Sequence, residues 1–230
     1  MRYPQKELMI RIYPSLISSD LLSLHTTISM LDHACAGFHI DVMDNHFVPN
    51  LTWGHHFINA IDAASCHPSW VHLMVDNPEQ ILDRCILKAN SIVSIHRETE
   101  RDVRALISKI RERILSPSIA ISPKTDLEET YSLLAHVDHV LIMSVEPGFS
   151  GQTLLPRALE KIAALRAYKE EKNYSFRIAI DGGITVENIG EAQSAGCDDY
   201  AVATAIFDKD SSNCNYLARL KNLYDLLGQR

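Results

Sequence analysis

The sequence lacks the long apolar run that a membrane-spanning helix needs. No segment approaches about 18 consecutive apolar residues, so no membrane span is expected. The segment from Met1 to Arg11 carries charges where a signal peptide requires an apolar stretch. We therefore expect neither a membrane anchor nor an export signal.

Two further absences narrow the class of protein. There is no long basic run and the formal net charge is -7, which excludes nucleic acid as an expected partner. The five cysteines are an odd number without C-x-x-C spacing, which argues against a disulfide framework or a cysteine zinc site. A reducing, cytoplasmic location is predicted. The cysteines are Cys35, Cys66, Cys85, Cys197 and Cys214.

The chain also lacks a linker, a low-complexity tract or a shift in composition that would divide it. With 230 residues, 46% of them hydrophobic, it is expected to form one domain over residues 1–230. Short apolar runs recur along it, and several are apolar on both faces, as buried parallel strands are. The eight predicted strands are Ile10–Ile17, Gly37–Met43, Trp70–Val75, Ser91–His96, Ser118–Ser122, His139–Val145, Phe176–Asp181 and Asp199–Thr204.

Helical patterns separate these strands. Asn77 and Pro78 form a typical helix start, Thr125 is a plausible cap for the helix that begins at Asp126, and Gly196 stands where a helix C-terminus favours glycine. The predicted helices are Leu21–His33, Pro78–Lys88, Glu100–Ile114, Asp126–Leu134, Leu159–Lys169, Glu187–Ala195 and Asn215–Leu227. Eight alternating units predict an α/β fold, a single-domain (β/α)8 TIM barrel, with an open doubly wound sheet as the alternative.

Polar side chains recur near the ends of these strands. Strand alternation places His39, Asp41 and Met43 on one face, His72 shares a face with Met74, and Asp181 ends the seventh strand. Active sites of such barrels lie at the C-terminal mouth, where these groups would meet. His39, Asp41, His72 and Asp181 together suit one divalent ion: zinc, iron, manganese or cobalt.

Each of these residues also has a plainer interpretation. A lone strand histidine is more often hydrogen-bonded core than a ligand, and Asp181 before Gly182 could simply begin a turn. Four such groups at strand ends are nevertheless hard to explain by stability alone, so the joint metal site is the favoured interpretation. Five other histidines are expected in loops or helices, as surface or packing residues without a role in the site: His46, His55, His56, His67 and His136.

Glycine-rich loops follow the late strands. Backbone N–H groups after strands seven and eight of this fold commonly hold phosphate, which predicts contacts at Gly182, Gly183, Ala203 and Thr204. The loop Gly148–Gly151, with Phe149 and Ser150, is a candidate lid. Three methionines, Met43, Met74 and Met143, stand at one depth, where they either pack the core or line the pocket and exclude water.

At these residues the chain resembles the ribulose-phosphate 3-epimerase family. The similarity runs from about Ile12 to Phe207, in the family's order. The matching stretches are Pro14–Leu16, His39–Asp44, His46–Leu51, Val71–Met74, Met143–Phe149, Gly151–Gln152 and Asp181–Ile184.

The resemblance implies a barrel enzyme that interconverts D-ribulose 5-phosphate and D-xylulose 5-phosphate in the pentose phosphate pathway. It implies a divalent metal, often zinc, at His39, Asp41, His72 and Asp181, with Asp41 and Asp181 also serving as catalytic acid and base. Ser15 and His72 would contact the sugar, and the loop Gly148–Gly151 with Gly182, Gly183, Ala203 and Thr204 would contact the phosphate.

The chain departs from the family pattern at a few positions, none of them a ligand or a catalytic carboxylate. Asn45 replaces a usual glycine, Ser122 a common asparagine, and Ser150 a frequent glycine in the lid. Ala203-Thr204 replaces a usual Gly-Ser pair, and the Ala203 methyl limits how closely backbone and anion can meet.

Epimerisation next to a carbonyl removes a proton from one face and delivers one to the other, so two carboxylates are expected. Asp41 and Asp181, from strands two and seven, would flank the sugar, one ionised and one protonated. Two alternatives stay open: a 3-epimerase of a six-carbon ketose phosphate such as D-allulose 6-phosphate, and an inactive sugar-phosphate-binding barrel. A homo-oligomer is a further open point, because Trp53, Phe57 and Ile58 could pack on a neighbour or on the barrel.

Overall fold

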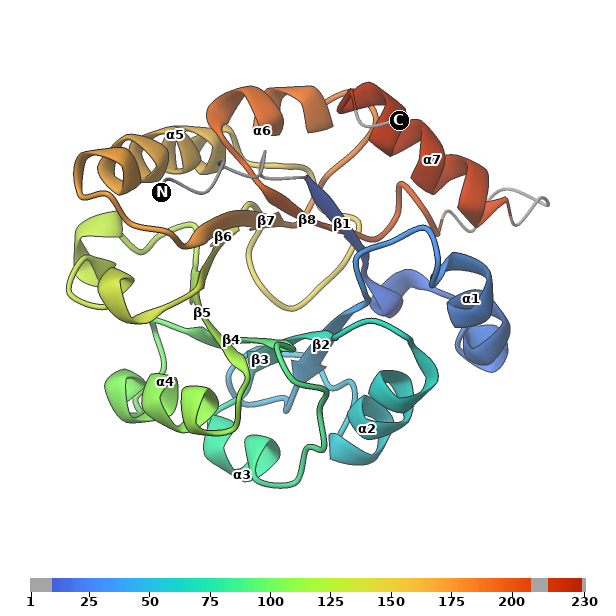
Figure 1. Ribbon diagram of the computed structural model, residues 1–230, viewed down its shortest axis with the longest axis horizontal. Helices are drawn as coiled ribbons and strands as arrows, with labels where there is room; N and C mark the ends of the chain where they lie inside the picture. Colours follow the sequence, from blue (N-terminus) through green and yellow to red (C-terminus); the bar gives the residue numbers. More distant parts are fainter. Residues whose placement is uncertain (1–9, 208–214, 229–230) are drawn as a thin grey trace, which may run out of the picture.

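Eight strands form one continuous parallel sheet in the computed structural model, which describes residues 10–207 and 215–228. The sheet order is β1-β8-β7-β6-β5-β4-β3-β2, and the strands form the inner ring of the molecule (Figure 1). All eight predicted strands are thereby confirmed. Their bounds are β1 Arg11–Pro14, β2 His39–Met43, β3 Trp70–Met74, β4 Ile92–His96, β5 Ser116–Ile121, β6 His139–Met143, β7 Arg177–Asp181 and β8 Asp199–Val202.

The ring closes between β1 and β2 through a parallel bridge from Ser15 to His39. Taken once around the sheet, the residue pairing does not return to its starting level but is displaced by eight residues along β1. This displacement is the shear of a (β/α)8 barrel. The closed barrel is therefore confirmed and the open doubly wound sheet is excluded.

Seven α-helices of the described residues surround the strands (Figure 1). Asn77 caps α3 by accepting from the Gln80 N–H, and Gly196 ends α6 at a φ of +106°, as predicted for both positions. The helices are α1 Leu24–Leu31, α2 His55–Ala64, α3 Pro78–Leu82, α4 Val103–Glu112, α5 Pro156–Glu171, α6 Ile189–Ala195 and α7 Tyr216–Leu226.

Three helix assignments differ from the sequence prediction. The predicted helix Pro78–Lys88 begins as predicted but ends at Leu82. Helix α2 was not predicted, because its apolar stripe is short and one of its three buried residues is Asp62. The predicted helix Asp126–Leu134 is instead two 3-10 turns, Leu127–Thr130 and Leu134–His136. Thr125 does not cap it, because its hydroxyl donates to the Glu98 carboxylate.

The outer faces of the strands pack against the helices in one large apolar core, which includes the buried Ile58. Trp53 and Phe57 stack on each other and pack, partly buried, against that core. This agrees with the prediction that they pack on the barrel itself. Among the described residues, Cys35, Cys66, Cys85 and Cys197 are free thiols, and Cys214 lies outside them. Within the same residues, no helix combines the length and the apolar character needed to span a bilayer.

Candidate metal centre and active site

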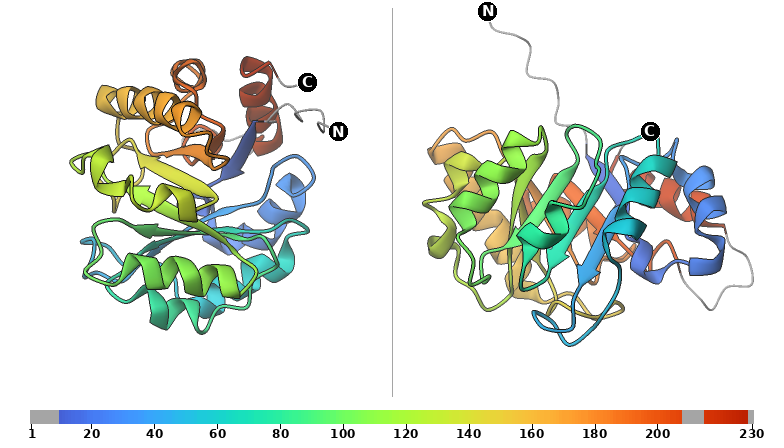
Figure 2. Two further views of the ribbon diagram at one scale, coloured as in Figure 1. Left: turned by 60° about the vertical axis from the view of Figure 1, so that its left-hand side comes forward. Right: turned by 90° about the horizontal axis from the view of Figure 1, so that it is seen from below.

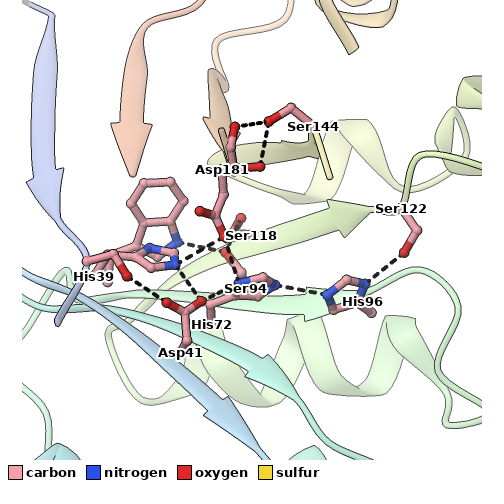
Figure 3. Close-up of polar contacts among 12 residues, drawn as sticks. His39, Asp41, His72, Ser94, His96, Ser118, Ser122, Ser144 and Asp181 are labelled. Atoms are coloured by element: carbon pink, nitrogen blue, oxygen red, sulfur yellow. Dashed lines mark hydrogen bonds and ion pairs between the residues drawn. The ribbon is translucent and has the colours of Figure 1, made fainter. Parts of the chain in front are cut away.

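Four side chains from three strands meet at the mouth of the barrel. His39 and Asp41 come from β2, His72 from β3 and Asp181 from the last position of β7. His39 Nε2 lies 3.0 Å from Asp41 Oδ1 and 3.5 Å from Asp181 Oδ2, and His72 Nδ1 lies 3.2 and 3.4 Å from the same two oxygens (Figure 3). All four donors lie within 4.8 Å of one another.

This spacing fits a single divalent ion. Neighbouring ligands bonded at about 2.0–2.2 Å to one ion stand roughly 3.0–3.5 Å apart, and the four nitrogen–oxygen separations fall in that range. Two imidazoles and two carboxylates are also a donor set that zinc and related transition metals accept. The residues present therefore fit the metal that the sequence predicts.

The sequence predicts His39 late in its strand. This prediction is wrong, because His39 is the first residue of β2. The stagger of a closed barrel explains the difference, because it sets the start of β2 level with Ser15, just past the end of β1. His72 is the middle residue of β3 and pairs with Asp41. Position along a strand is thus a poor guide to depth in the barrel when neighbouring strands are offset.

Burial and opposite charges control the protonation of the cluster in the ion-free protein. Burial alone would lower the pKa of His39, but Asp41 and Asp181 raise it to about 10. Burial alone would raise the pKa of Asp41, but His39 and His72 hold it well below its usual value. The pKa of Asp181 is also lowered by the histidines, against the effects of burial and of Asp41. Without an ion, a protonated imidazole therefore balances the carboxylates.

The cluster rests on buried neighbours. Ser15 Oγ donates to Asp41 Oδ2 over 2.7 Å, so both oxygens of that carboxylate are engaged. The His39 ring meets Trp70 edge-on, with 4.4 Å between ring centroids. His39 Nδ1 is buried and finds no hydrogen-bond partner in the described part of the chain.

A small cavity of about 50 Å³ opens onto this cluster at the carboxyl ends of the strands. In the right-hand view of Figure 2 the loops after β2 and β6 project from the same end of the barrel. Most of the predicted substrate and lining residues border the cavity: Ser15, Asp41, Met43, Met74, Met143, Gly148, Phe149, Ser150, Gly151, Asp181, Gly182, Gly183, Ala203 and Thr204. His39 and His72 lie fully buried below it. Phe149, at 56% exposure, leaves a large apolar side chain in solvent beside the cavity.

The glycines after β7 have a packing reason that the sequence did not reveal. A Cβ on Gly182 would stand 2.4 Å from Val145 Cγ2, and one on Gly183 would stand 2.4 Å from the Leu154 backbone nitrogen. Both residues also have positive φ, +106° and +61°. These two glycines thus bring the β7 loop directly against the segment that follows β6, which carries the candidate lid.

Asn45 shows why one departure from the family pattern is tolerated. Its φ is +61°, a left-handed conformation that glycine adopts freely and that asparagine accepts better than most residues. The loop that begins there contacts the candidate lid, because Asn50 Nδ2 donates to the Gly148 carbonyl over 2.7 Å.

Sequence reasoning missed two residues next to the cluster, His96 and Glu98. His96 Nε2 lies 2.9 Å from His72 Nε2, and His96 Nδ1 lies 3.0 Å from Glu98 Oε2. Burial opposes ionisation of Glu98, but its hydrogen bonds with His96, Thr125 and Ser122 lower its pKa to about 2. The signal was the same alternation of histidine and acid that singled out His39 and Asp41. The five histidines without an assigned role stay outside the cluster.

Fold and cluster together define a (β/α)8 barrel with a candidate metal centre at its mouth. The model of the ribulose-phosphate 3 epimerase family matches residues 11–207. The chain is 36% identical to ribulose-phosphate 3-epimerase of Treponema pallidum over 195 residues, 84% of this chain and 89% of that relative. It is 34% identical to the Escherichia coli K12 protein of the same name over 200 residues, 86% and 89% of the two chains. The chain therefore belongs to the ribulose-phosphate 3-epimerase family.

Solved structures share the barrel at much lower identity. A mutant tryptophan synthase alpha-subunit from Pyrococcus furiosus superposes with a TM-score of 0.65 at 11% identity, covering 96% of this chain and 100% of that one. A 3-hexulose-6-phosphate synthase gives 0.61 at 13% identity, covering 94% and 99%. At these identities the likeness concerns the fold alone.

Proposed function

We propose that this protein is a metal-dependent epimerase that interconverts D-ribulose 5-phosphate and D-xylulose 5-phosphate by proton transfer at C3. The observation that carries the proposal is the convergence of Asp41 and Asp181 with two histidines below a cavity at the barrel mouth. Family membership supplies the reaction class, since the similar bacterial proteins carry that enzyme name. The intact cluster argues against the inactive barrel.

His39, Asp41, His72 and Asp181 would hold the metal. When bound, a divalent ion supplies a Lewis acid that stabilises negative charge on the sugar oxygens next to C3. The charges of the cluster suit a divalent ion, because the two carboxylates together carry two negative charges and the imidazoles beside them can lose their protons when the ion binds.

The two carboxylates perform the proton transfers. One takes the C3 proton from one face of the sugar, and the other delivers a proton to the opposite face of the planar enediolate. Their roles exchange with the direction of the reaction, and we propose that one is protonated when substrate is bound. Ser15 holds Asp41 by its second oxygen, which keeps that carboxylate aimed at the cluster.

The cavity walls position the sugar phosphate and exclude water. Met43, Met74 and Met143, all buried, present apolar side chains beside the reacting carbon. Gly182, Gly183, Ala203 and Thr204, which also border the cavity, would offer backbone to the phosphate, and the loop Gly148–Gly151 would close over it. Binding energy from the phosphate then orients C3 without taking part in the chemistry.

A coupled assay for xylulose 5-phosphate tests the proposal. We expect turnover with Zn²⁺, Fe²⁺, Mn²⁺ or Co²⁺ and its loss in excess chelator, with recovery when metal is restored. The same assay with D-allulose 6-phosphate separates the pentose substrate from the six-carbon alternative. Absence of epimerisation with every metal and both sugars would contradict the proposal.

The free thiols of the described residues are consistent with a cytoplasmic location, and the oligomeric state stays a prediction.

A further inference from the structure

His72 is the one cluster ligand whose second ring nitrogen contacts another titratable side chain of the described residues. Its Nε2 lies 2.9 Å from His96 Nε2 (Figure 3 labels both residues). The other ring nitrogen of His96, Nδ1, lies 3.0 Å from Glu98 Oε2. Both rings are buried. His39 Nδ1, by contrast, is buried without a hydrogen-bond partner among the same residues. The two imidazoles of the cluster are therefore held by different means.

The proton positions along the hydrogen-bonded chain His72–His96–Glu98 follow from which atoms can donate and which can only accept. A histidine that ligates an ion through Nδ1 keeps its one proton on Nε2. Two N–H groups cannot point at each other, so His96 Nε2 must then accept from His72 Nε2–H. The remaining proton of His96 sits on Nδ1 and is donated to Glu98, because an ionised carboxylate only accepts.

Glu98 is itself fixed as an acceptor on its other oxygen. Oε1 accepts the Ser122 backbone N–H over 2.8 Å and the Thr125 hydroxyl. The loop that carries these donors is clamped by the buried Lys161, whose Nζ donates to the carbonyls of Ser122, Pro123 and Thr125 at 2.9, 2.8 and 2.6 Å. Glu98 Oε2 is thereby directed at His96.

We propose that Glu98 and His96 are positioning residues that keep the proton of His72 on Nε2, so that Nδ1 offers its lone pair to the cation. The proposal rests on the metal site of the proposed function. Hydrogen-bond acceptors behind metal-ligating histidines fix ring orientation and tautomer, and their loss typically lowers metal affinity about 10–100-fold.

Glu98→Gln is a sharp test because the change is isosteric. Ser122 N–H and Thr125 O–H require an acceptor at the Oε1 position, so the new amide places its NH₂ against His96 Nδ1. His96 Nδ1 then accepts, so the His96 proton moves to Nε2 and is donated to His72 Nε2. The His72 proton moves to Nδ1, where it occupies the lone pair that would bind the ion. We expect Zn²⁺ affinity, measured by competition with a chelator, to fall about 10–100-fold.

Glu129→Gln is the matched control. It removes the same charge from a side chain that is 51% exposed and pairs with Arg97, so its Zn²⁺ affinity should stay within about twofold of the parent protein. Equal Zn²⁺ affinity in Glu98→Gln and the parent would overturn the proposal.

Nitrogen-15 NMR of histidine-labelled parent protein reads the tautomers directly and does not depend on any variant folding. In the Zn²⁺-loaded protein we expect the proton on His72 Nε2 and on His96 Nδ1; a proton on His96 Nε2 would refute the inference. If the parent protein binds no Zn²⁺, the metal dependence of the proposed function fails, while the metal-free spectrum still shows which way the His72–His96 hydrogen bond runs. The two failures are thus distinguishable.

Discussion

The Ser15 hydroxyl donates to Asp41 Oδ2 over 2.7 Å, while Oδ1 of the same carboxylate faces both histidines of the cluster. One short hydrogen bond from the end of β1 thus sets the rotation of a proposed catalytic acid on β2. This contact stands at the seam where the barrel closes, beside the Ser15–His39 bridge. The residue that closes the barrel, Ser15, therefore also orients this carboxylate.

Ser15→Ala tests that contact. A hydrogen bond to a charged group is worth about 1.5–3 kcal/mol, so kcat should fall at least roughly tenfold with the fold intact. Ser18→Ala is the control, because the buried Ser18 hydroxyl makes no hydrogen bond within the described residues. Steady-state kinetics on both variants decides the point, and equal kcat values would remove Ser15 from the proposed mechanism.

Asp41→Asn and Asp181→Asn should each lower kcat by about 10²–10⁴-fold or more, because general acid–base groups contribute that much and the proposed metal would lose a charged ligand. Parent enzyme run in deuterium oxide should carry solvent deuterium at C3 of the product, as mass spectrometry will show. Asp83→Asn, at an exposed carboxylate paired with Lys109, should be neutral. Turnover near the parent rate in either cluster variant would contradict the two-carboxylate scheme.

Gly183→Ala should destabilise the protein by about 2 kcal/mol or more. Left-handed backbone costs a non-glycine residue about 1–2 kcal/mol, and the new Cβ would also meet the Leu154 backbone nitrogen at 2.4 Å. Gly151→Ala has a similar φ of +80° but nothing within 4 Å, so it should show the conformational cost alone. Urea unfolding of the two variants separates the terms, and equal losses would show that the close approach is relieved cheaply.

Asp199 predicts a pH dependence of stability at the opposite end of the barrel. Its carboxylate is fully buried and accepts from Arg177 Nε at 2.8 Å, with His139 Nε2 at 3.1 Å. Burial alone would raise the pKa of Asp199, but these partners lower it. Because the folded pKa lies below the unfolded one, its contribution is present above about pH 4 and is lost as pH falls through the folded value.

Asp199→Asn should therefore cost about 3–5 kcal/mol at pH 7, since it takes the carboxylate away from a buried cation. The difference in unfolding free energy from the parent should be constant from about pH 8 to 5 and shrink below about pH 4. Asp126→Asn, at an exposed ion pair with Arg157, should change stability by less than about 1 kcal/mol. A difference that stays constant down to acid pH would refute a specific role for the Asp199 charge.

The sequence predicted the strands better than the segments between them. Strand β6, for example, is buried along its whole length, and its Val140, Leu141 and Ile142 form a short apolar run that is visible in the sequence alone. Local patterns do not predict helix α2 because its buried stripe contains Asp62, and they predict a helix in place of the turns after β5 because Thr125 stands where a cap would. In both cases a partner distant in sequence, invisible to local patterns, determines what the polar side chain does.

Alternation and apolar runs are local properties of the chain, so they are enough to predict the barrel and the four residues that meet at its mouth. The folded structure sets how deep each residue lies, because the eight-residue stagger places the first residue of β2 beside Ser15. It alone placed His96 and Glu98 behind His72 and packed Gly183 against Leu154. Such contacts depend on how strands and loops are offset in space, which no single segment specifies.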